Sequence, residues 1–94
     1  MKKNNYPFEI NKNYFIRTIT MALVGKLIEV YDDFLILSNA SWVADSGRFN
    51  DALRLGLLMN DNVDIEPFVD NVIVNKNSIV DMTIYNHDLP KYPN

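Results

Sequence analysis

The residues of this 94-residue chain whose types and spacing suggest chemistry gather in one stretch, from Trp42 to Phe49. It holds the only tryptophan, together with Asp45, Arg48 and the expected start of a helix. Helix N-termini attract anions through their free amides, and arginine binds carboxylate or phosphate bidentately. We therefore expect a small anionic ligand or a nucleotide here, with its base on Trp42 or Phe49. The alternative is structural: both aromatic side chains belong to the core, Asp45 caps the helix and Arg48 pairs with a carboxylate.

Catalytic and metal chemistry have little support elsewhere in the chain. There is no cysteine and only one histidine, His87, so a standard zinc site cannot form. His87 has no candidate nucleophile nearby, and its position beside Asp88-Leu89-Pro90 suggests a surface turn. No phosphate-binding glycine loop and no metal-ligand spacing is present. We expect a protein that is not an enzyme and that uses no cofactor or metal.

The composition is that of one small domain with a large share of apolar residues, 48% of the chain. A chain of this length hides only about 60–65% of the surface that its unfolded form exposes. Part of the apolar surface should therefore lie where a second copy of the chain can cover it. The net charge of −3 argues against nucleic-acid binding through the whole surface, which requires a basic protein. Residues 14–87 are expected to form the domain, between tails at 1–13 and 88–94.

The expected location is the cytoplasm. The absence of cysteine is compatible with a reducing compartment. The N-terminal residues carry no apolar stretch that would make a signal peptide, and no run approaches the roughly 20 apolar residues that span a bilayer. No membrane partner is expected.

Most of the chain is predicted to be strand. From Tyr14 to Tyr31 both sets of alternating residues are apolar, unlike a strand with one wet face. Gly25 lies in the middle, where a strand interior has glycine at a bulge or a sharp bend. The segment is therefore either two strands or one long, strongly bent strand. Asp32-Asp33 then predicts a hairpin over 24–37, and residues 38–41 form a looser stretch.

The second half of the chain predicts a helix, an edge segment and another hairpin. The helix is expected over 47–56, with Asp45 or Ser46 as its N-cap and Gly56 as its C-cap. Residues 65–68 contain a proline and should form a short edge segment. The run Asn75-Lys76-Asn77-Ser78 predicts a tight reversal between two aliphatic strands, residues 72–74 and 79–85.

Two stretches resemble the motifs of the Sm-like family, which includes a bacterial RNA-chaperone branch. The first, residues 25–39, runs Gly-Lys-Leu-Ile-Glu-Val-Tyr-Asp-Asp-Phe-Leu-Ile-Leu-Ser-Asn. The second, residues 72–80, runs Val-Ile-Val-Asn-Lys-Asn-Ser-Ile-Val. Together they cover about a quarter of the chain. The resemblance implies a mainly β fold, a strongly bent five-stranded barrel that builds closed rings by edge-strand pairing, here with one short helix inserted at about 47–56.

The resemblance also implies a nucleic-acid site at the two turns. In Sm-like rings the turns face the central pore, where single-stranded bases stack on an aromatic ring and a basic residue meets phosphate. The corresponding residues here are Tyr31, Asn75, Lys76 and Asn77. Asp32-Asp33 would repel the same phosphates, and the alternative is that both are ordinary turns. The family usually has a basic residue and glycine where this chain has Lys76-Asn77, and its connection is shorter than residues 44–68.

Arg17 lies within an apolar strand and is expected to be buried and paired. Its candidate partners are Glu29, Glu66 and Asp81, in a structural or intersubunit ion pair.

Two main functions remain open from the sequence. The first is a non-enzymatic, ring-forming binding or assembly module that recognises single-stranded RNA or a small anionic ligand. The second is a structural or interaction protein, such as a phage particle component or a sequestering protein, without a nucleic-acid role.

Overall fold

The structure is mainly β, as predicted, and contains one short α-helix among the residues it describes. It is a computed structural model, and it describes residues 8–45, 47–59 and 63–90, without the side chains of Phe49 and Met59. The elements in chain order are β1 (Asn13–Thr18), β2 (Ala22–Val30), β3 (Phe34–Asp45), α1 (Phe49–Leu55), β4 (Asp64–Pro67), β5 (Val72–Asn75) and β6 (Ile79–Ile84). Two 3-10 turns, Leu57–Met59 and Lys76–Ser78, complete the list.

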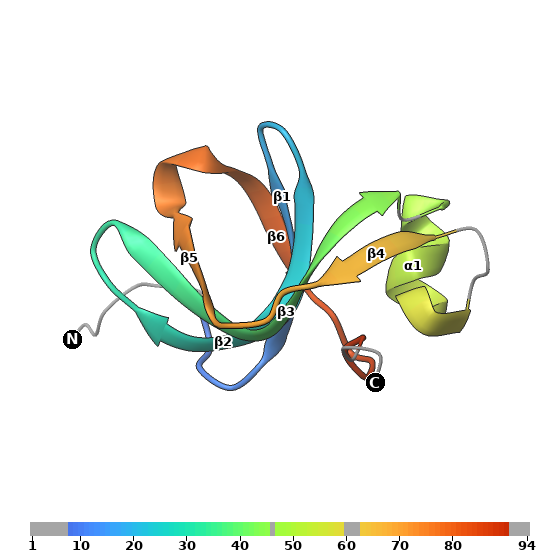
Figure 1. Cartoon of the computed structure of the whole chain (residues 1–94), viewed down its shortest axis with the longest axis horizontal. Coiled ribbons are helices and arrows are strands. Elements are labelled where there is room, and N and C mark those ends of the chain that lie inside the picture. The colour runs from blue at the N-terminus through green and yellow to red at the C-terminus, as the bar shows by residue number, and fades with distance from the viewer. Residues whose placement is uncertain (1–7, 46, 60–62, 91–94) are drawn as a thin grey trace.

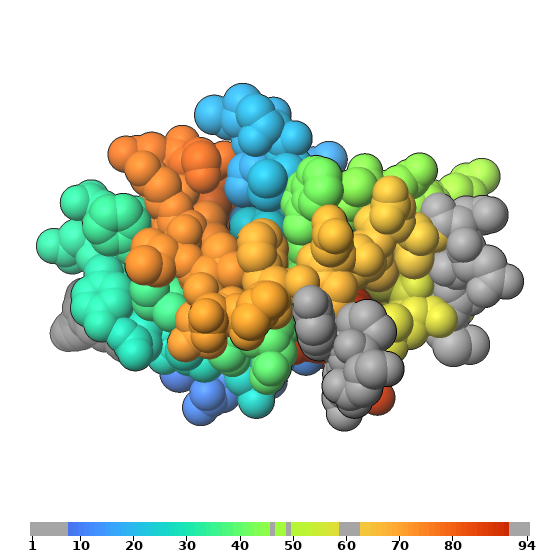
Figure 2. All heavy atoms as spheres, viewed as in Figure 1, coloured from blue at the N-terminus to red at the C-terminus, as the bar shows by residue number. Residues whose placement is uncertain are grey.

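The strands form one antiparallel sheet that curls strongly but is not closed (Figure 1). The order is β4-β3-β2-β1-β6, and β5 also pairs with β3. The expectation of five strands is therefore corrected to six, because β4 and β5 pair with successive halves of the long β3. Figure 2 shows the face on which the turn after β1 (blue) lies near the segment from β4 to β5 (orange), where the sheet stays open.

The bend of β3 lies where a looser stretch was expected. Residues 38–41 belong to one continuous strand of 12 residues, and Asn39 has a φ of +49°. Asparagine tolerates this conformation better than most residues, so the strand can turn without ending. β5 then pairs with residues 34–37 before the bend, and β4 pairs with residues 41–45 after it.

The segment from Tyr14 to Tyr31 is two strands, and the break does not fall at the glycine. The turn lies between β1 and β2, where the Thr18 N–H and the Met21 carbonyl oxygen are 2.7 Å apart. Gly25 lies inside β2, next to a shift in the β2–β3 register. A Cβ atom at Gly25 would come within 2.9 Å of the Ala40 Cβ, so glycine permits the close approach of β3.

The hairpin over 24–37 is confirmed, but the second predicted hairpin is wrong. Tyr31 N–H donates to the Phe34 carbonyl oxygen at 2.8 Å, which closes the β2–β3 turn. Residues 76–78 instead form a 3-10 turn, after which β5 and β6 diverge: β5 pairs with β3, and β6 pairs with β1. The polar residues favour a local turn, as predicted, but they do not decide which strands pair.

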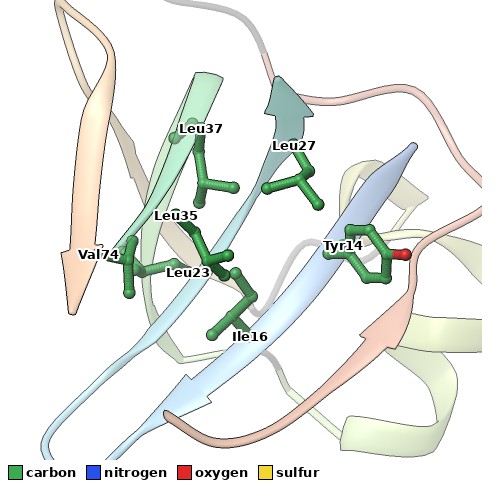
Figure 3. Packing of buried hydrophobic residues seen from close by; sticks show 8 residues of the cluster. Tyr14, Ile16, Leu23, Leu27, Leu35, Leu37 and Val74 are labelled. Atoms are coloured by element: carbon green, nitrogen blue, oxygen red, sulfur yellow. The ribbon is translucent and has the colours of Figure 1, made fainter. Parts of the chain in front are cut away.

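Two apolar clusters lie on opposite faces of the sheet. The inner cluster fills the curl of the sheet (Figure 3) and consists of Tyr14, Ile16, Leu23, Leu27, Leu35, Leu37, Ala40 and Val74. The helix cluster lies on the other face, against α1, and consists of Phe15, Val24, Val43, Ala52, Leu57 and Tyr85. Both alternating faces of β1 and β2 are therefore apolar because the chain covers each of them itself. This pattern alone does not require a second copy.

The helix lies within the predicted range but has a different start. The helix N-cap is Arg48, and no side chain caps the helix. The Asp45 carboxylate instead accepts the Gly47 N–H at 2.8 Å, so the expected Asp45 cap is not formed; Ser46 lies outside the described residues. Gly56 ends the helix as predicted, with a φ of +89° and its N–H bonded to the Ala52 carbonyl oxygen at 3.0 Å.

Packed residues also occur in the segments expected to be tails. Phe8 packs against the inner cluster, and Leu89 packs against the helix cluster. With α1 at one end and the curled sheet at the other, the molecule is elongated, with extents of 45 × 26 × 23 Å (Figure 1).

Candidate functional site

The described side chains of the expected anion site, those of Trp42, Asp45 and Arg48, lie in different surroundings. Trp42 is half-buried on β3 and packs against the inner cluster. Arg48 is 87% exposed at the start of α1, with its Nε 3.9 Å from a carboxylate oxygen of Asp51 in the same helix. Asp45 is occupied with Gly47, and the side chain of Phe49 lies outside the described residues. A helix of seven residues whose first turn already carries Asp51 offers little to an anion.

The two turns of the expected nucleic-acid site do lie side by side. Phe34 pairs with Asn75 in the β3–β5 register, and Lys76 N–H donates to the Asp33 carbonyl oxygen at 2.9 Å. The two turns are therefore neighbours within one chain. The pairing of β5 with the start of β3 brings the two turns together.

The side chains at these turns are engaged within the chain. The Tyr31 hydroxyl donates to the Glu29 carboxylate, and this hydrogen bond raises the pKa of Tyr31. The Lys76 ammonium lies over the ring of Phe8, 5.5 Å from its centroid. The Asn75 side chain accepts the Asn77 N–H at 2.8 Å. The ring of Tyr31 is exposed and stays open to a base.

An apolar hollow occupies the place where the sheet is open. We call it the seam hollow; it measures about 430 Å³, within the usual range of small-molecule sites. Residues 18–21 and Leu23 form one wall, and residues 72–75, Ser78 and Phe68 form the other. Ile19 and Ile73 are 75% and 67% exposed here, whereas Val74 belongs to the inner cluster. The seam hollow thus leads from the surface to the core.

A second hollow of about 500 Å³, which we call the Trp42 hollow, lies next to the seam hollow. Its lining residues are Met21, Trp42, Glu66, Pro67, Phe68 and Val69. The two hollows share Met21 and Phe68, so they form one continuous apolar surface. Sequence reasoning assigned residues 65–68 to an edge segment and did not connect them with Trp42. The available signal was the adjacent apolar pair Phe68-Val69, directly after a proline.

Arg17 forms the expected pair with Asp81, but it is not buried. The two residues are direct partners in the β1–β6 register, and Arg17 Nε donates to an Asp81 carboxylate oxygen at 2.9 Å. Both side chains are 49% exposed, which corrects the expected burial. The hydrogen bond from Arg17 lowers the pKa of Asp81. This pair therefore joins two strands and is not directed at a ligand.

His87 contacts the helix, and it also lines a hollow of about 300 Å³ at the end of α1. Its Nε2 is 2.8 Å from the Leu53 carbonyl oxygen, and its ring meets the Tyr85 ring edge-on at 5.2 Å between centroids. The described residues contain no group of three or more His, Cys, Asp or Glu side chains placed to hold a metal ion. Across the same part of the chain, no helix has the length and apolar character needed to cross a membrane.

Comparison with protein-family models, with curated proteins and with solved structures gives no match for this chain.

Proposed function

We propose that this chain is a non-enzymatic assembly module that joins copies of itself into a ring. In this arrangement the free edge of β6 in one copy pairs with the free edge of β5 in the next. The proposal extends the likeness to the small, bent barrels of the Sm-like family. An assembly of this kind uses two different edges, so each copy pairs through β6 with one neighbour and through β5 with the other. The series of copies closes into a ring if the rotation between neighbours permits.

The observation that carries the proposal is the pair of unpaired edges with exposed aliphatic side chains. In the described part of the chain β5 pairs only with β3, and β6 pairs only with β1. Ile73 on β5 is 67% exposed, and Val80 on β6 is 62% exposed. An open strand edge with apolar side chains is a template for pairing with another chain, which natural proteins usually block. Neither strand carries a proline or a lysine at this edge.

The surroundings of the two turns favour assembly over RNA binding. The Lys76 ammonium is turned toward Phe8, and the Lys76 N–H donates to the Asp33 carbonyl oxygen, so the turn at Asp32-Asp33 lies next to Lys76. Phosphate binding supplies most of the salt-dependent affinity for nucleic acid. A site with an engaged lysine beside the carboxylates of Asp32 and Asp33 supplies little of this affinity. The proposed module therefore needs no nucleic acid, and a structural or interaction role is the second candidate if the chain stays monomeric.

Complementary edge variants test the proposal directly. We expect wild-type protein at about 100 μM to form a closed oligomer of defined mass by native mass spectrometry and light scattering. Ile73→Lys and Val80→Lys should each be monomeric alone, because each has one charged edge. A mixture of the two retains one intact β6 edge and one intact β5 edge, and should give a dimer.

Leu55→Lys is the matched control, since Leu55 is 54% exposed but lies on α1, away from both edges. It should assemble like the wild type. A monomeric wild-type protein, or a mixture that gives no dimer, contradicts the proposal. Fluorescence anisotropy with a short single-stranded RNA at two salt concentrations tests the RNA alternative, because phosphate contacts must weaken as salt rises.

A further inference from the structure

The Trp42 hollow combines aromatic and apolar walls with one carboxylate. Of its six lining residues, Glu66 is the only charged one. Trp42 and Glu66 are direct partners in the β3–β4 register, so their side chains leave the sheet on the same face. Phe68 follows β4, and its N–H donates to the Ala40 carbonyl oxygen at 2.8 Å, which holds this residue beside β3. Met21 reaches the hollow from the turn after β1.

The position of Met21 is fixed by its own turn. Its N–H donates to the Thr18 hydroxyl at 3.1 Å, and that hydroxyl donates to the Met21 carbonyl oxygen at 2.9 Å. Trp42 is held in place because it packs against the inner cluster. The hollow is therefore built on paired strands and a hydrogen-bonded turn, which gives it a defined shape before any ligand arrives.

We propose that the Trp42 hollow binds a basic side chain, lysine or arginine, of a partner protein. A cation near an aromatic face is attracted by the ring quadrupole, and tryptophan is the best such ring. Glu66 supplies an opposite charge, and no described residue forms an ion pair with it. The aliphatic stem of a lysine or arginine covers apolar surface while its charged end stays near water. Met21, Pro67 and Val69 offer that surface.

The charge of the chain favours the same ligand over an anionic or neutral one. The net charge of −3 attracts cations to the surface and repels anions. A purely apolar ligand would gain nothing from the Glu66 carboxylate. This inference does not depend on the proposed ring, because the residues that line the hollow include neither Ile73 nor Val80.

The single tryptophan makes the test specific. The indole N–H of Trp42 gives one resonance in a proton–nitrogen NMR spectrum of the full chain. We expect N-acetyl-arginine methylamide and N-acetyl-lysine methylamide to shift it saturably, with dissociation constants on the order of 1–10 mM for such small probes. N-acetyl-norleucine methylamide has the same stem without the charge, and it should bind at least several-fold more weakly.

Two substitutions separate the two parts of the site. Glu66→Gln keeps the shape and removes the charge, and should weaken binding of the cationic probes about two- to five-fold. Phe68→Leu keeps an apolar wall and removes the ring, and should weaken it by a similar factor. Asp64→Asn is the control: it removes a carboxylate from the same strand, β4, at a residue that does not line the hollow. It should leave binding unchanged.

Each alternative outcome overturns the inference. Equal binding of the norleucine probe means an apolar pocket without cation selectivity. An equal effect of Asp64→Asn means general attraction to an acidic surface. No shift of the Trp42 signal at about 50 mM probe means that the hollow takes no basic side chain. The backbone spectrum of each variant checks its fold, and the wild-type comparison of charged and neutral probes decides the question even if one variant fails to fold.

Discussion

At the scale of single residues, Tyr85 and Tyr31 show how the surroundings determine what a tyrosine hydroxyl contributes to stability. The Tyr85 hydroxyl accepts the N–H of Leu57 at 2.7 Å in the helix cluster, and Tyr85 is only 1% exposed. Burial raises the pKa of Tyr85. The Tyr31 hydroxyl donates to Glu29 at the surface, where Tyr31 is 54% exposed.

Removing these two hydroxyl groups should therefore have different effects. Tyr85→Phe leaves the buried Leu57 N–H without a partner, and should lower the free energy of unfolding by about 1–3 kcal/mol. In Tyr31→Phe, water replaces the hydroxyl at the Glu29 carboxylate, so the free energy of unfolding should change by less than about 0.5 kcal/mol. Urea titrations of both variants measure the difference. Equal losses would mean that the Leu57 N–H finds another partner.

The residues of the candidate site could be predicted only in part. The sequence indicates Trp42 as a candidate binding residue, because an aromatic ring near polar residues stands out, and Trp42 does line a hollow of the structure. Its expected companions Asp45 and Arg48 are near it in the chain, yet β3 ends at Asp45 and Arg48 is the N-cap of α1, so neither residue lines the Trp42 hollow. Its actual neighbours, Met21 and Phe68, come from distant segments that only strand pairing brings together.

At the scale of elements, the contact between β2 and β3 depends on the absence of a side chain. A Cβ atom at Gly25 would lie 2.9 Å from the Ala40 Cβ and 3.3 Å from the Leu37 Cβ. Real Cβ atoms do not approach backbone or packed side chains this closely, so one strand must move. Both strands contribute to the inner cluster, and a shift of either one disturbs it.

Gly25→Ala should accordingly destabilise the protein by about 1–3 kcal/mol, the usual cost of overpacking. The double variant Gly25→Ala with Ala40→Gly removes the closest contact and should recover part of this loss. Unfolding in urea of the wild type, both single variants and the double variant gives the coupling free energy. Simple additivity of the two substitutions would show that the β2–β3 approach is not limited by these two positions.

The sequence predicts local elements better than it predicts their partners. Asn75, Lys76 and Asn77 predicted a turn, and a turn is present, because asparagine side chains bond nearby amides wherever the strands go. The pairing of β5 with β3 follows from burial of Val74 in the inner cluster, which no local pattern contains. The bend at Asn39 was not predicted, because a bent strand and a loose stretch have similar compositions at residues 38–41.

At the scale of the whole molecule, two clusters share one sheet. Phe15 belongs to the helix cluster and Ile16 to the inner cluster, although they are neighbours in β1. This sharing explains why the apolar pattern of β1 and β2 has no wet face. The apolar pattern that suggested self-association is therefore satisfied within the chain, and the proposed assembly rests instead on the exposed edges of β5 and β6.

The shared sheet predicts that the two clusters unfold together, because neither face of β1, β2 or β3 can lose its cover while the other stays folded. Trp42 fluorescence reports the inner cluster, and the NMR signal of the Ala52 amide, bonded to the Arg48 carbonyl oxygen at 3.0 Å, reports α1. Both probes should give the same urea midpoint. Leu57→Ala, in the helix cluster, should lower stability by about 2–5 kcal/mol and move both midpoints equally. If only the Ala52 signal moved, α1 would be an independently folding cover, because the sheet would then keep its inner cluster without it.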